Sequence, residues 1–432
     1  MYNKLKVLSF LAMVFIVILP GMSLAAGTGE AEGGNKDLKV MSYNLRYASS
    51  SGSNSWEVRR PVMAQLLNKE KPDIMGIQEG LYHQLKDLHA DMPQYDWIGI
   101  GRQGGSRDEY TAVFYNKNKF TPLEYDYFWL SDTPNVIGSK TWGNQITRMV
   151  TWVKFEDVKT KQQFYFMNTH FDHISVPARE NSAELIVQKM NALDPLLPVI
   201  LTGDFNVAPN TKPYQTLINE GKFADTWVEA ETRINENLGT FNGFQDPTGG
   251  ANRIDWILVK GNISVKEAAI NNYTKNGQYP SDHYPVIATM VIEPHEPSLA
   301  IGKPATGSQA CAASEGPEKA FDGVTIQNSK FCTKTPAKWL QVDLGSSYEV
   351  SKFIIYHAGF GGESPSMNTK DFNILISEDG STWSTAVQAL GNTANVTTHA
   401  ISPVKARYVK LEVTNSGSDE AARIYEVGVY GK

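Results

Sequence analysis

The chain has 432 residues, a formal net charge of −6 and two cysteines. This length allows two or three domains, each with a hydrophobic core of its own. The mild negative charge argues against a broad basic face for nucleic-acid backbone, and two cysteines are too few to build a structural zinc site by themselves.

Residues 1–26 have the pattern of a secretory signal peptide. Lys4 and Lys6 precede an apolar run over residues 7–19, and small residues at Ala25 and Ala26 offer a cleavage site. The apolar run is shorter than the roughly 20 residues that span a bilayer, which argues against a membrane anchor. We therefore expect a secreted, extracellular protein with no transmembrane segment, whose Gly- and Glu-rich residues 27–36 form a flexible leader.

From residue 38 to residue 293, strand-like and helix-like patterns alternate, which predicts an α/β domain. Apolar residues recur at helical spacing over residues 60–68 and 183–193. Strand-like runs cover residues 110–115, 149–155, 164–169, 254–259 and 286–292. The apolar residues of these runs are expected to form the core, so the polar residues at their ends carry the information about function.

The most informative segment is residues 199–206, an apolar run that ends in Gly-Asp-Phe-Asn. Taken alone, its Asp204 and Asn206 are explained equally well as turn formers. Polar residues also stand at the ends of other apolar segments along the chain: Asn44, Glu79, His170, Asp255, Asp282 and His283. This recurrence predicts one site assembled from the ends of several strands.

These side chains are carboxylates, amides and imidazoles, without a cysteine among them. Hard oxygen donors favour Mg²⁺ or Mn²⁺ over a softer metal. Such an ion beside histidines suits phosphate-ester hydrolysis, because the metal neutralises charge on the phosphoryl oxygens while a histidine activates water. Outside this context, a lone histidine such as His283 would more often be structural.

The motifs that carry these residues follow one another along the chain as MSYNLR, DIMGIQE, TAVFY, NTHFD, LTGDFN, RIDWILV and SDHYPV. In this order they resemble the endonuclease/exonuclease/phosphatase superfamily, also called the DNase-I-like fold. The resemblance implies a four-layer α/β sandwich of two packed mixed β-sheets flanked by helices, and a metal-dependent phosphoric ester hydrolase. Family members cleave DNA, RNA ends, sphingomyelin, inositol phosphates and sugar phosphates, so the fold does not give the substrate.

The resemblance also implies roles for the residues that bind metal and water. Glu79 resembles the metal-binding glutamate, with Asn44 beside it. Asp282 resembles a second acid of the metal site. Asp204 and Asn206 resemble the pair that positions the nucleophilic water and the scissile phosphate.

Proton transfer is assigned by the same resemblance. His283 resembles the general base and Asp255 the carboxylate that orients it. His170 resembles the histidine that donates to a phosphoryl or leaving oxygen. Arg148 stands where related enzymes place a phosphate-contacting arginine, although a charged residue opening a strand explains it equally well. His173 follows the NTHFD motif and is a further candidate, although a loop cap would also explain it.

A second domain is expected over about residues 299–432, after a Pro-punctuated linker at residues 293–297. Alternating apolar residues and frequent turn signals, with almost no helical pattern, predict a β-sandwich. The segments at residues 320–323, 339–345 and 423–431 resemble the discoidin, or coagulation factor 5/8 type C, module. The resemblance implies an all-β jelly-roll sandwich that binds carbohydrate.

Two further features of this domain are predicted. By the same resemblance, Asp322 and Glu426 hold a structural Ca²⁺, although Asp322-Gly323 is also explained as a simple turn. Cys311 and Cys332 are expected to form a disulfide, because a cysteine pair in an exported protein is more often oxidised than free.

The sequence thus predicts a secreted Mg²⁺-dependent phosphoesterase, acting on a phosphorylated glycan or lipid and directed to it by a carbohydrate-binding domain. Two alternatives stay open. A secreted endonuclease or exonuclease would carry several basic residues along its cleft, for which Arg102, Arg107 and Arg148 are modest candidates. A non-catalytic glycan-binding adhesin would have an inactive first domain, which the complete set of motif residues argues against.

Overall fold

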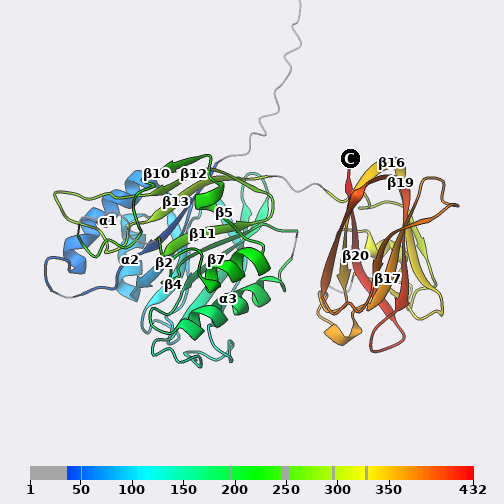
Figure 1. The fold of residues 1–432 in the computed structure, drawn as a ribbon, viewed down its shortest axis with the longest axis horizontal. Coiled ribbons are helices and arrows are strands. Elements are labelled where there is room, and N and C mark those ends of the chain that lie inside the picture. Colours follow the sequence, from blue (N-terminus) through cyan, green and yellow to red (C-terminus); the bar gives the residue numbers. More distant parts are fainter. Residues whose placement is uncertain (1–36, 50, 195, 246–252, 294–296, 326–328) are drawn as a thin grey trace, which may run out of the picture. The chain divides into compact units, whose positions relative to one another are not determined.

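The computed structural model describes residues 37–49, 51–194, 196–245, 253–293, 297–325 and 329–432 (Figure 1). The predicted signal peptide at residues 1–26 and the predicted leader at residues 27–36 lie outside the described residues. Among the residues described, no helix combines the length and the apolar character needed to cross a bilayer.

One mixed sheet of the first domain has seven strands in the order β10-β12-β13-β1-β2-β4-β3. β1 and β2 run parallel, and their neighbours β13 and β4 run antiparallel to them. The carboxyl ends of β1 and β2 therefore meet the start of β13 at one edge. The strands are β1 (Leu38–Asn44), β2 (Ile74–Gly80), β3 (Tyr95–Ile98), β4 (Tyr110–Asn116), β10 (Thr232–Ile234), β12 (Ile263–Ile270) and β13 (Val286–Ile292).

The other mixed sheet has six strands in the order β5-β6-β7-β8-β11-β9. Here β7 and β8 are parallel, and β11 is antiparallel to β8 with Asp255 opposite Asp204. The end of β8 and the start of β11 are thus side by side. The strands are β5 (Phe120–Trp129), β6 (Met149–Asp157), β7 (Gln163–His170), β8 (Val199–Asp204), β9 (Ala224–Asp225) and β11 (Asp255–Lys260).

Helices cover the outer faces of both sheets. Helices α1 (Trp56–Glu70) and α2 (Tyr82–Asp91) bury apolar side chains against β1, β2 and β4. Helix α3 (Val176–Met190) does the same against β6, β7 and β8, while α4 (Lys212–Gln215) and α5 (Thr226–Glu229) are single turns. A separate cluster fills the space between the sheets, including Val40 and Ile74 from one and Phe166 and Ile200 from the other. The predicted four-layer α/β sandwich is confirmed.

The helix predicted over residues 183–193 begins earlier than expected, at the end of a polar segment. Ser175 is its N-cap, and the Ser175 hydroxyl accepts a hydrogen bond from the backbone N–H of Ala178. Pro177 fits the first turn, where its missing N–H leaves no hydrogen bond unmade. Cap and proline define the start of α3, and the apolar periodicity follows only later.

One buried amide ties the two sheets together at the edge where these strands end. Asn168, near the end of β7, donates through Nδ2 to the carbonyl oxygens of Ile77 at 2.7 Å and Ala112 at 2.9 Å. Its Oδ1 accepts from Gln78 Nε2 at 2.8 Å and from Thr202 Oγ1 at 3.1 Å. Both sheets therefore share one set of buried hydrogen bonds, which fixes their strand ends relative to one another.

The second domain is all β, as predicted. Its strands pair antiparallel in the order β15-β20-β16-β19-β17-β18, and β14 pairs with β16. Residues expected to point inward, such as Leu340, Val342 and Ile374, are fully buried in its core. The sulfurs of Cys311 and Cys332 form a disulfide. The strands are β14 (Ala305–Gly307), β15 (Phe331–Thr333), β16 (Lys338–His357), β17 (Asp371–Ser377), β18 (Ser384–Ala389), β19 (Val396–Asn415) and β20 (Ala422–Gly431).

Candidate active site

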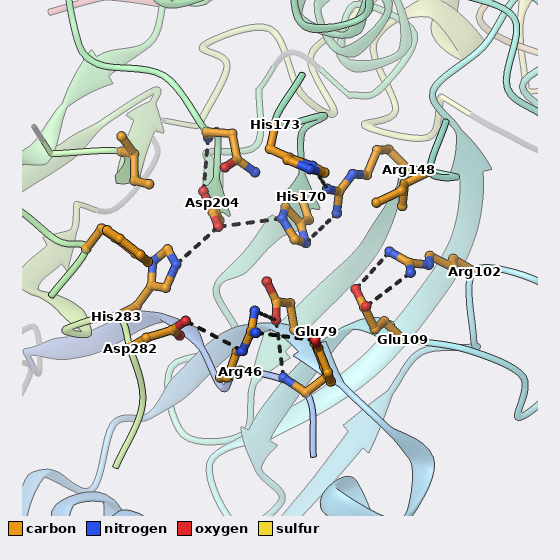
Figure 2. Close-up of a pocket in the computed structure, with 15 residues that line it drawn as sticks. Arg46, Glu79, Arg102, Glu109, Arg148, His170, His173, Asp204, Asp282 and His283 are labelled. Carbon is orange, nitrogen blue, oxygen red and sulfur yellow. Dashed lines mark hydrogen bonds and ion pairs between the residues drawn. The ribbon is translucent and has the colours of Figure 1, made fainter. Parts of the chain in front are cut away.

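The strand ends of the first domain surround an open cavity of about 460 Å³. Asn44 and Glu79 come from the ends of β1 and β2, and His170 and Asp204 from the last residues of β7 and β8. Asp255 opens β11, and Asp282 and His283 lie shortly before β13. Figure 2 shows the labelled side chains pointing from all sides toward the same space. The cavity is lined by Arg46, Tyr47, Glu79, Arg102, Glu109, Ile146, Arg148, His170, His173, Asp204, Asn206, Phe241, Ile254, Asp282 and His283.

Asn44 connects two of the carboxylates. Its Nδ2 lies 3.1 Å from Glu79 Oε1 and 3.0 Å from Asp204 Oδ2, so the amide donates to both sheets. Its Oδ1 accepts from the backbone N–H of Arg46 at 2.9 Å, which fixes the orientation of the amide. The other carboxylate oxygen of Glu79 accepts from the backbone N–H of Tyr47 at 3.2 Å. Both oxygens of Glu79 are therefore held in place at the cavity wall.

A guanidinium group lies between the two acids predicted to bind metal. Arg46 Nη1 is 3.7 Å from Glu79 Oε2, and Arg46 Nε is 3.6 Å from Asp282 Oδ2 (Figure 2). Burial raises the pKa of Asp282, opposed by the charges of His283 and Arg46 among its neighbours. Positive charge at this position compensates two partly desolvated carboxylates, which is what a divalent cation would also do.

Oxygen-rich side chains at the site fit a divalent cation. Of the predicted metal residues, Glu79 and Asp282 offer carboxylate oxygens, whereas Asn44 turns its Nδ2 toward Glu79 and Asp204 and its oxygen toward a backbone N–H. A second group consists of Asp204, Asp255 and His283, whose ligand atoms all lie within 4.8 Å of one another. Asp255 Oδ1 is buried and has no hydrogen-bond partner among the described residues, so that oxygen has a lone pair to offer. Carboxylates and an imidazole without thiolates suit Mg²⁺ or Mn²⁺.

His283 stands between two carboxylates. Its Nδ1 lies 2.9 Å from Asp255 Oδ2, and its Nε2 lies 3.8 Å from Asp204 Oδ2. Burial alone would lower the pKa of His283, but the charges of Asp255 and Asp204 and the hydrogen bond to Asp255 outweigh it and raise the pKa to about 10. Burial, followed by the charge of Asp255, raises the pKa of Asp204 to about 7. This cluster holds protons that neutral solution would otherwise remove, so it is suited to proton transfer.

Arg148 determines which ring nitrogen of His170 carries the proton. Its Nη1 lies 2.9 Å from His170 Nδ1, and its Nη2 lies 3.2 Å from His173 Nδ1. A guanidinium only donates, so Nδ1 of His170 accepts and the ring proton is on Nε2. Burial, and then the charge of Arg148, hold the pKa of His170 well below its usual value, so this ring is neutral. Its Nε2–H faces Asp204 Oδ2 at 3.5 Å and is available to an oxygen bound in the cavity.

The structure brings together every residue that the sequence predicts for the first domain's site. Seven of them line the cavity: Glu79, Arg148, His170, Asp204, Asn206, Asp282 and His283. Asn44 and Asp255 lie behind this lining and hold it through hydrogen bonds. The structural explanation of Arg148 is also correct in part, because this residue directly precedes β6.

Several cavity residues escaped the sequence analysis. Arg46 belongs to the MSYNLR motif, so proximity to Asn44 could have indicated it. Glu109 precedes the TAVFY strand in the same way that other site residues flank strands. Phe241 lies in a segment with no distinctive pattern. The sequence analysis names His173 with a loop cap as the alternative, and the structure places it in the cavity wall beside Arg148.

Comparison with known families gives two matches along the chain. The model of the Endonuclease/Exonuclease/phosphatase family matches residues 41–283. The model of the F5/8 type C domain matches residues 304–427. Both matches fall within the domains expected from the sequence.

Three individual proteins illustrate the similarity. A mannosyl-6-phosphatase of Bacteroides thetaiotaomicron is 38% identical, with a TM-score of 0.56 over 59% of this chain and 99% of that one. An endonuclease/exonuclease/phosphatase of Bacteroides vulgatus is 34% identical, with a TM-score of 0.57 over 60% of this chain and 100% of that one. An uncharacterised protein of Acanthamoeba polyphaga mimivirus is 32% identical over 39% of this chain and 67% of its own length.

Proposed function

The chain belongs to the endonuclease/exonuclease/phosphatase family and is a metal-dependent phosphoric ester hydrolase, and from this premise we propose that it removes phosphate from a phosphorylated carbohydrate. The relative that supports this substrate is the mannosyl-6-phosphatase, which is 38% identical and is matched over 99% of its length. A carbohydrate substrate also agrees with the presence of an F5/8 type C domain at residues 304–427.

The observation that carries the proposal is the pairing of the arginines that line the cavity. Arg46 faces Glu79, Arg102 lies 2.8 Å from Glu109, and Arg148 donates to His170. A nucleic-acid groove needs unpaired basic side chains to follow successive phosphates. Here Glu79 and Glu109 offset the charges of Arg46 and Arg102, while Arg148 keeps its charge beside the neutral His170. That distribution favours a single phosphate group on a small alcohol over a polynucleotide.

The proposal gives the metal-binding and water-binding residues of the cavity separate roles in hydrolysis. Glu79 and Asp282, with Asn44 beside them, would hold Mg²⁺, which would supply positive charge to the phosphoryl oxygens. Asp204 orients the attacking water, and Asn206 contacts the phosphate from the same turn. Asn206 Nδ2 donates one hydrogen to the carbonyl oxygen of Phe171 at 3.0 Å, and its second N–H is the donor that can contact a phosphate oxygen.

The two histidines, His283 and His170, have different roles in the reaction. His283, oriented by Asp255 at 2.9 Å, accepts the proton of the attacking water. His170 donates a hydrogen bond from its Nε2–H to a phosphoryl or leaving oxygen and keeps that proton, in the tautomer that Arg148 enforces. Arg148 also adds positive charge close to the phosphate, where charge accumulates in the transition state.

For the second domain we propose glycan binding and a structural Ca²⁺. Within the part of the chain that the structure describes, the buried Glu426 Oε1 has no hydrogen-bond partner, while its Oε2 accepts from the backbone N–H of Gly323 at 3.2 Å. Burial raises the pKa of Glu426 to about 8, and the nearby charge of Asp322 adds to this effect. A free buried carboxylate oxygen beside a second acid is the environment that Ca²⁺ would stabilise.

We also propose that the protein is secreted. The signal-peptide pattern of residues 1–26 supports this location. The disulfide between Cys311 and Cys332 supports it independently, because such bonds persist in oxidising compartments. Secretion would place the enzyme where the second domain meets polymeric or cell-surface carbohydrate.

The test is phosphate release by the purified full chain with Mg²⁺. Suitable substrates are hexose 6-phosphates, a phosphorylated mannan, bis-(p-nitrophenyl) phosphate, sphingomyelin, single- and double-stranded DNA, and RNA. We expect the highest kcat/KM for a phosphorylated sugar, and its loss in EDTA. Faster cleavage of DNA or RNA would support the nuclease alternative. Glycan binding without hydrolysis of any substrate would support the adhesin.

A further inference from the structure

One wall of the cavity carries an ion pair that no step of the proposed reaction uses. Arg102 Nη1 lies 2.8 Å from Glu109 Oε2, and Arg102 Nη2 lies 3.1 Å from Glu109 Oε1. Both side chains are mostly buried, with exposed fractions of 12% and 16%. Figure 2 shows this pair at one side of the cavity and His283 at the other. Two parallel hydrogen bonds hold both planar groups in one orientation.

The loop that carries the pair is fixed from both ends. It connects β3 to β4, and the backbone N–H of Arg102 donates to the carbonyl oxygen of Glu109 at 2.9 Å. The indole N–H of Trp129 donates to the carbonyl oxygen of Arg102 at 2.8 Å. Asp108 adds a further contact, 2.8 Å from Arg102 Nη2. The pair is therefore a preorganised part of the wall.

An aromatic ring lines the cavity on the side of His283. Phe241 is 49% exposed, and its ring centroid is 5.2 Å from that of His283 with the planes at 72°. An exposed phenylalanine ring in a polar cavity is stabilised when an apolar surface covers it and excludes water. The C–H face of a sugar ring provides such a surface while its hydroxyls point elsewhere.

We propose that the Arg102–Glu109 pair and Phe241 form a subsite for the sugar that carries the phosphate, an inference that rests on the proposed function. Adjacent hydroxyls can donate to Glu109, since each carboxylate oxygen keeps a lone pair after the ion pair has formed, and accept from the second N–H of Arg102 Nη1. The phosphate then lies among Arg148, His170 and His283, and the sugar ring between Phe241 and the ion pair. The cavity of about 460 Å³ lies within the range of small-ligand sites, about 300–1,000 Å³.

The chemistry of Glu109 agrees with this role. Arg102 offsets the negative charge of Glu109, which weakens this carboxylate as a ligand for a cation and still leaves lone pairs for hydroxyl donors. Burial raises the pKa of Glu109 to about 7 against the opposing charge of Arg102. Hydrogen bonds from two hydroxyls therefore stabilise this buried carboxylate more than they would stabilise an exposed one.

The test compares hydrolysis of a hexose 6-phosphate by the full chain with that of phenyl phosphate, which lacks hydroxyls. Loss of a hydrogen bond to a charged group corresponds to roughly 10–100-fold in kcat/KM. We therefore expect Glu109→Gln to lower the ratio of kcat/KM for the sugar phosphate over phenyl phosphate by about that factor. Phe241→Leu should raise KM for the sugar phosphate more than for methyl phosphate, which has no ring to pack against this side chain. Glu124→Gln, at an exposed position of β5, is the matched control with an unchanged ratio.

The outcomes separate the two proposals. If the wild type hydrolyses no sugar phosphate but cleaves another phosphoester, the proposed function is wrong and this subsite with it. If the wild type prefers the sugar phosphate and both variants lose activity equally on it and on their comparison substrate, the proposed function stands and the subsite is wrong. Phe241→Leu keeps the test decisive if Glu109→Gln unfolds, because the Phe241 side chain is half exposed.

Discussion

Replacing Asn168 tests whether the amide between the two sheets holds the site together. Asn168→Ala removes the donor to the carbonyl oxygens of Ile77 and Ala112 and the acceptor for Gln78 and Thr202. Each buried polar group left without a partner costs about 1–3 kcal/mol. Gln78 Nε2 retains only contacts of 3.4 Å, while Thr202 Oγ1 keeps a carbonyl oxygen at 3.2 Å. Two to three groups therefore lose their partner, and the expected loss of unfolding free energy is about 3–5 kcal/mol.

The assay is thermal unfolding followed by calorimetry of the full chain. For a domain of this size about 3–5 kcal/mol corresponds to a fall of roughly 10 °C in the unfolding temperature of the first domain. Asn168→Asp should be no better, because it keeps an acceptor but turns a carboxylate oxygen toward two carbonyl oxygens. Asn118→Ala, on the exposed turn between β4 and β5, is the control and should change the temperature little. An unfolding temperature within about 2 °C of the wild type for Asn168→Ala would refute the reasoning.

Three further predictions concern the two metal sites and the base. Glu79→Gln should weaken Mg²⁺ binding measured by calorimetry and lower kcat by about 100-fold or more, since a carboxylate is needed to hold a hard cation; unchanged Mg²⁺ affinity would contradict the assignment. Glu426→Gln should abolish a Ca²⁺-dependent rise in the unfolding temperature of the second domain, whereas Glu378→Gln, at an exposed position, should keep it. His283 must lose its proton to act as base, and its raised pKa places the rising limb of the pH–rate profile above 6.5. Asp255→Asn removes the charge that raises this pKa, so the limb should move to lower pH and kcat should fall; a limb that stays in place would mean that the base is another group, with Asp204 the first candidate.

Much of the fold follows from patterns that are local in the sequence. Residues 110–115, 149–155 and 286–292 are predicted as strands and lie in β4, β6 and β13. Their apolar residues are buried whatever the neighbouring strand is, so periodicity alone identifies them. Boundaries depend on other signals, and α3 begins seven residues before its expected start because Ser175 caps it.

The parts of the site that the sequence did not indicate depend on contacts between distant segments. Arg102 was expected only as a candidate for nucleic-acid binding, and its pairing with Glu109 depends on the path of one loop. Asn168 is the first residue of the NTHFD motif, but its role as a tie requires Gln78 and Thr202 of two different sheets to meet it. No periodicity encodes such pairs, because the partners are brought together only by the packing of the sheets.

The geometry of the strand ends reconciles the two interpretations of the Gly-Asp-Phe-Asn segment. Asn206 has a left-handed backbone with φ of 53°, and its N–H donates to Asp204 Oδ1 at 2.9 Å, as in an Asx turn. The end of β1 repeats this arrangement, where Arg46 has φ of 55° and its N–H donates to Asn44 Oδ1 at 2.9 Å. In both places the turn occupies one oxygen of the side chain and orients the rest of the group: Asp204 Oδ2 accepts from Asn44 Nδ2. Left-handed backbone costs about 1–3 kcal/mol at a non-glycine residue, and the surrounding sheets must offset it. The turn chemistry is thus the means by which the strands aim their acid and amide groups, so the same residues serve as turn formers and as the site.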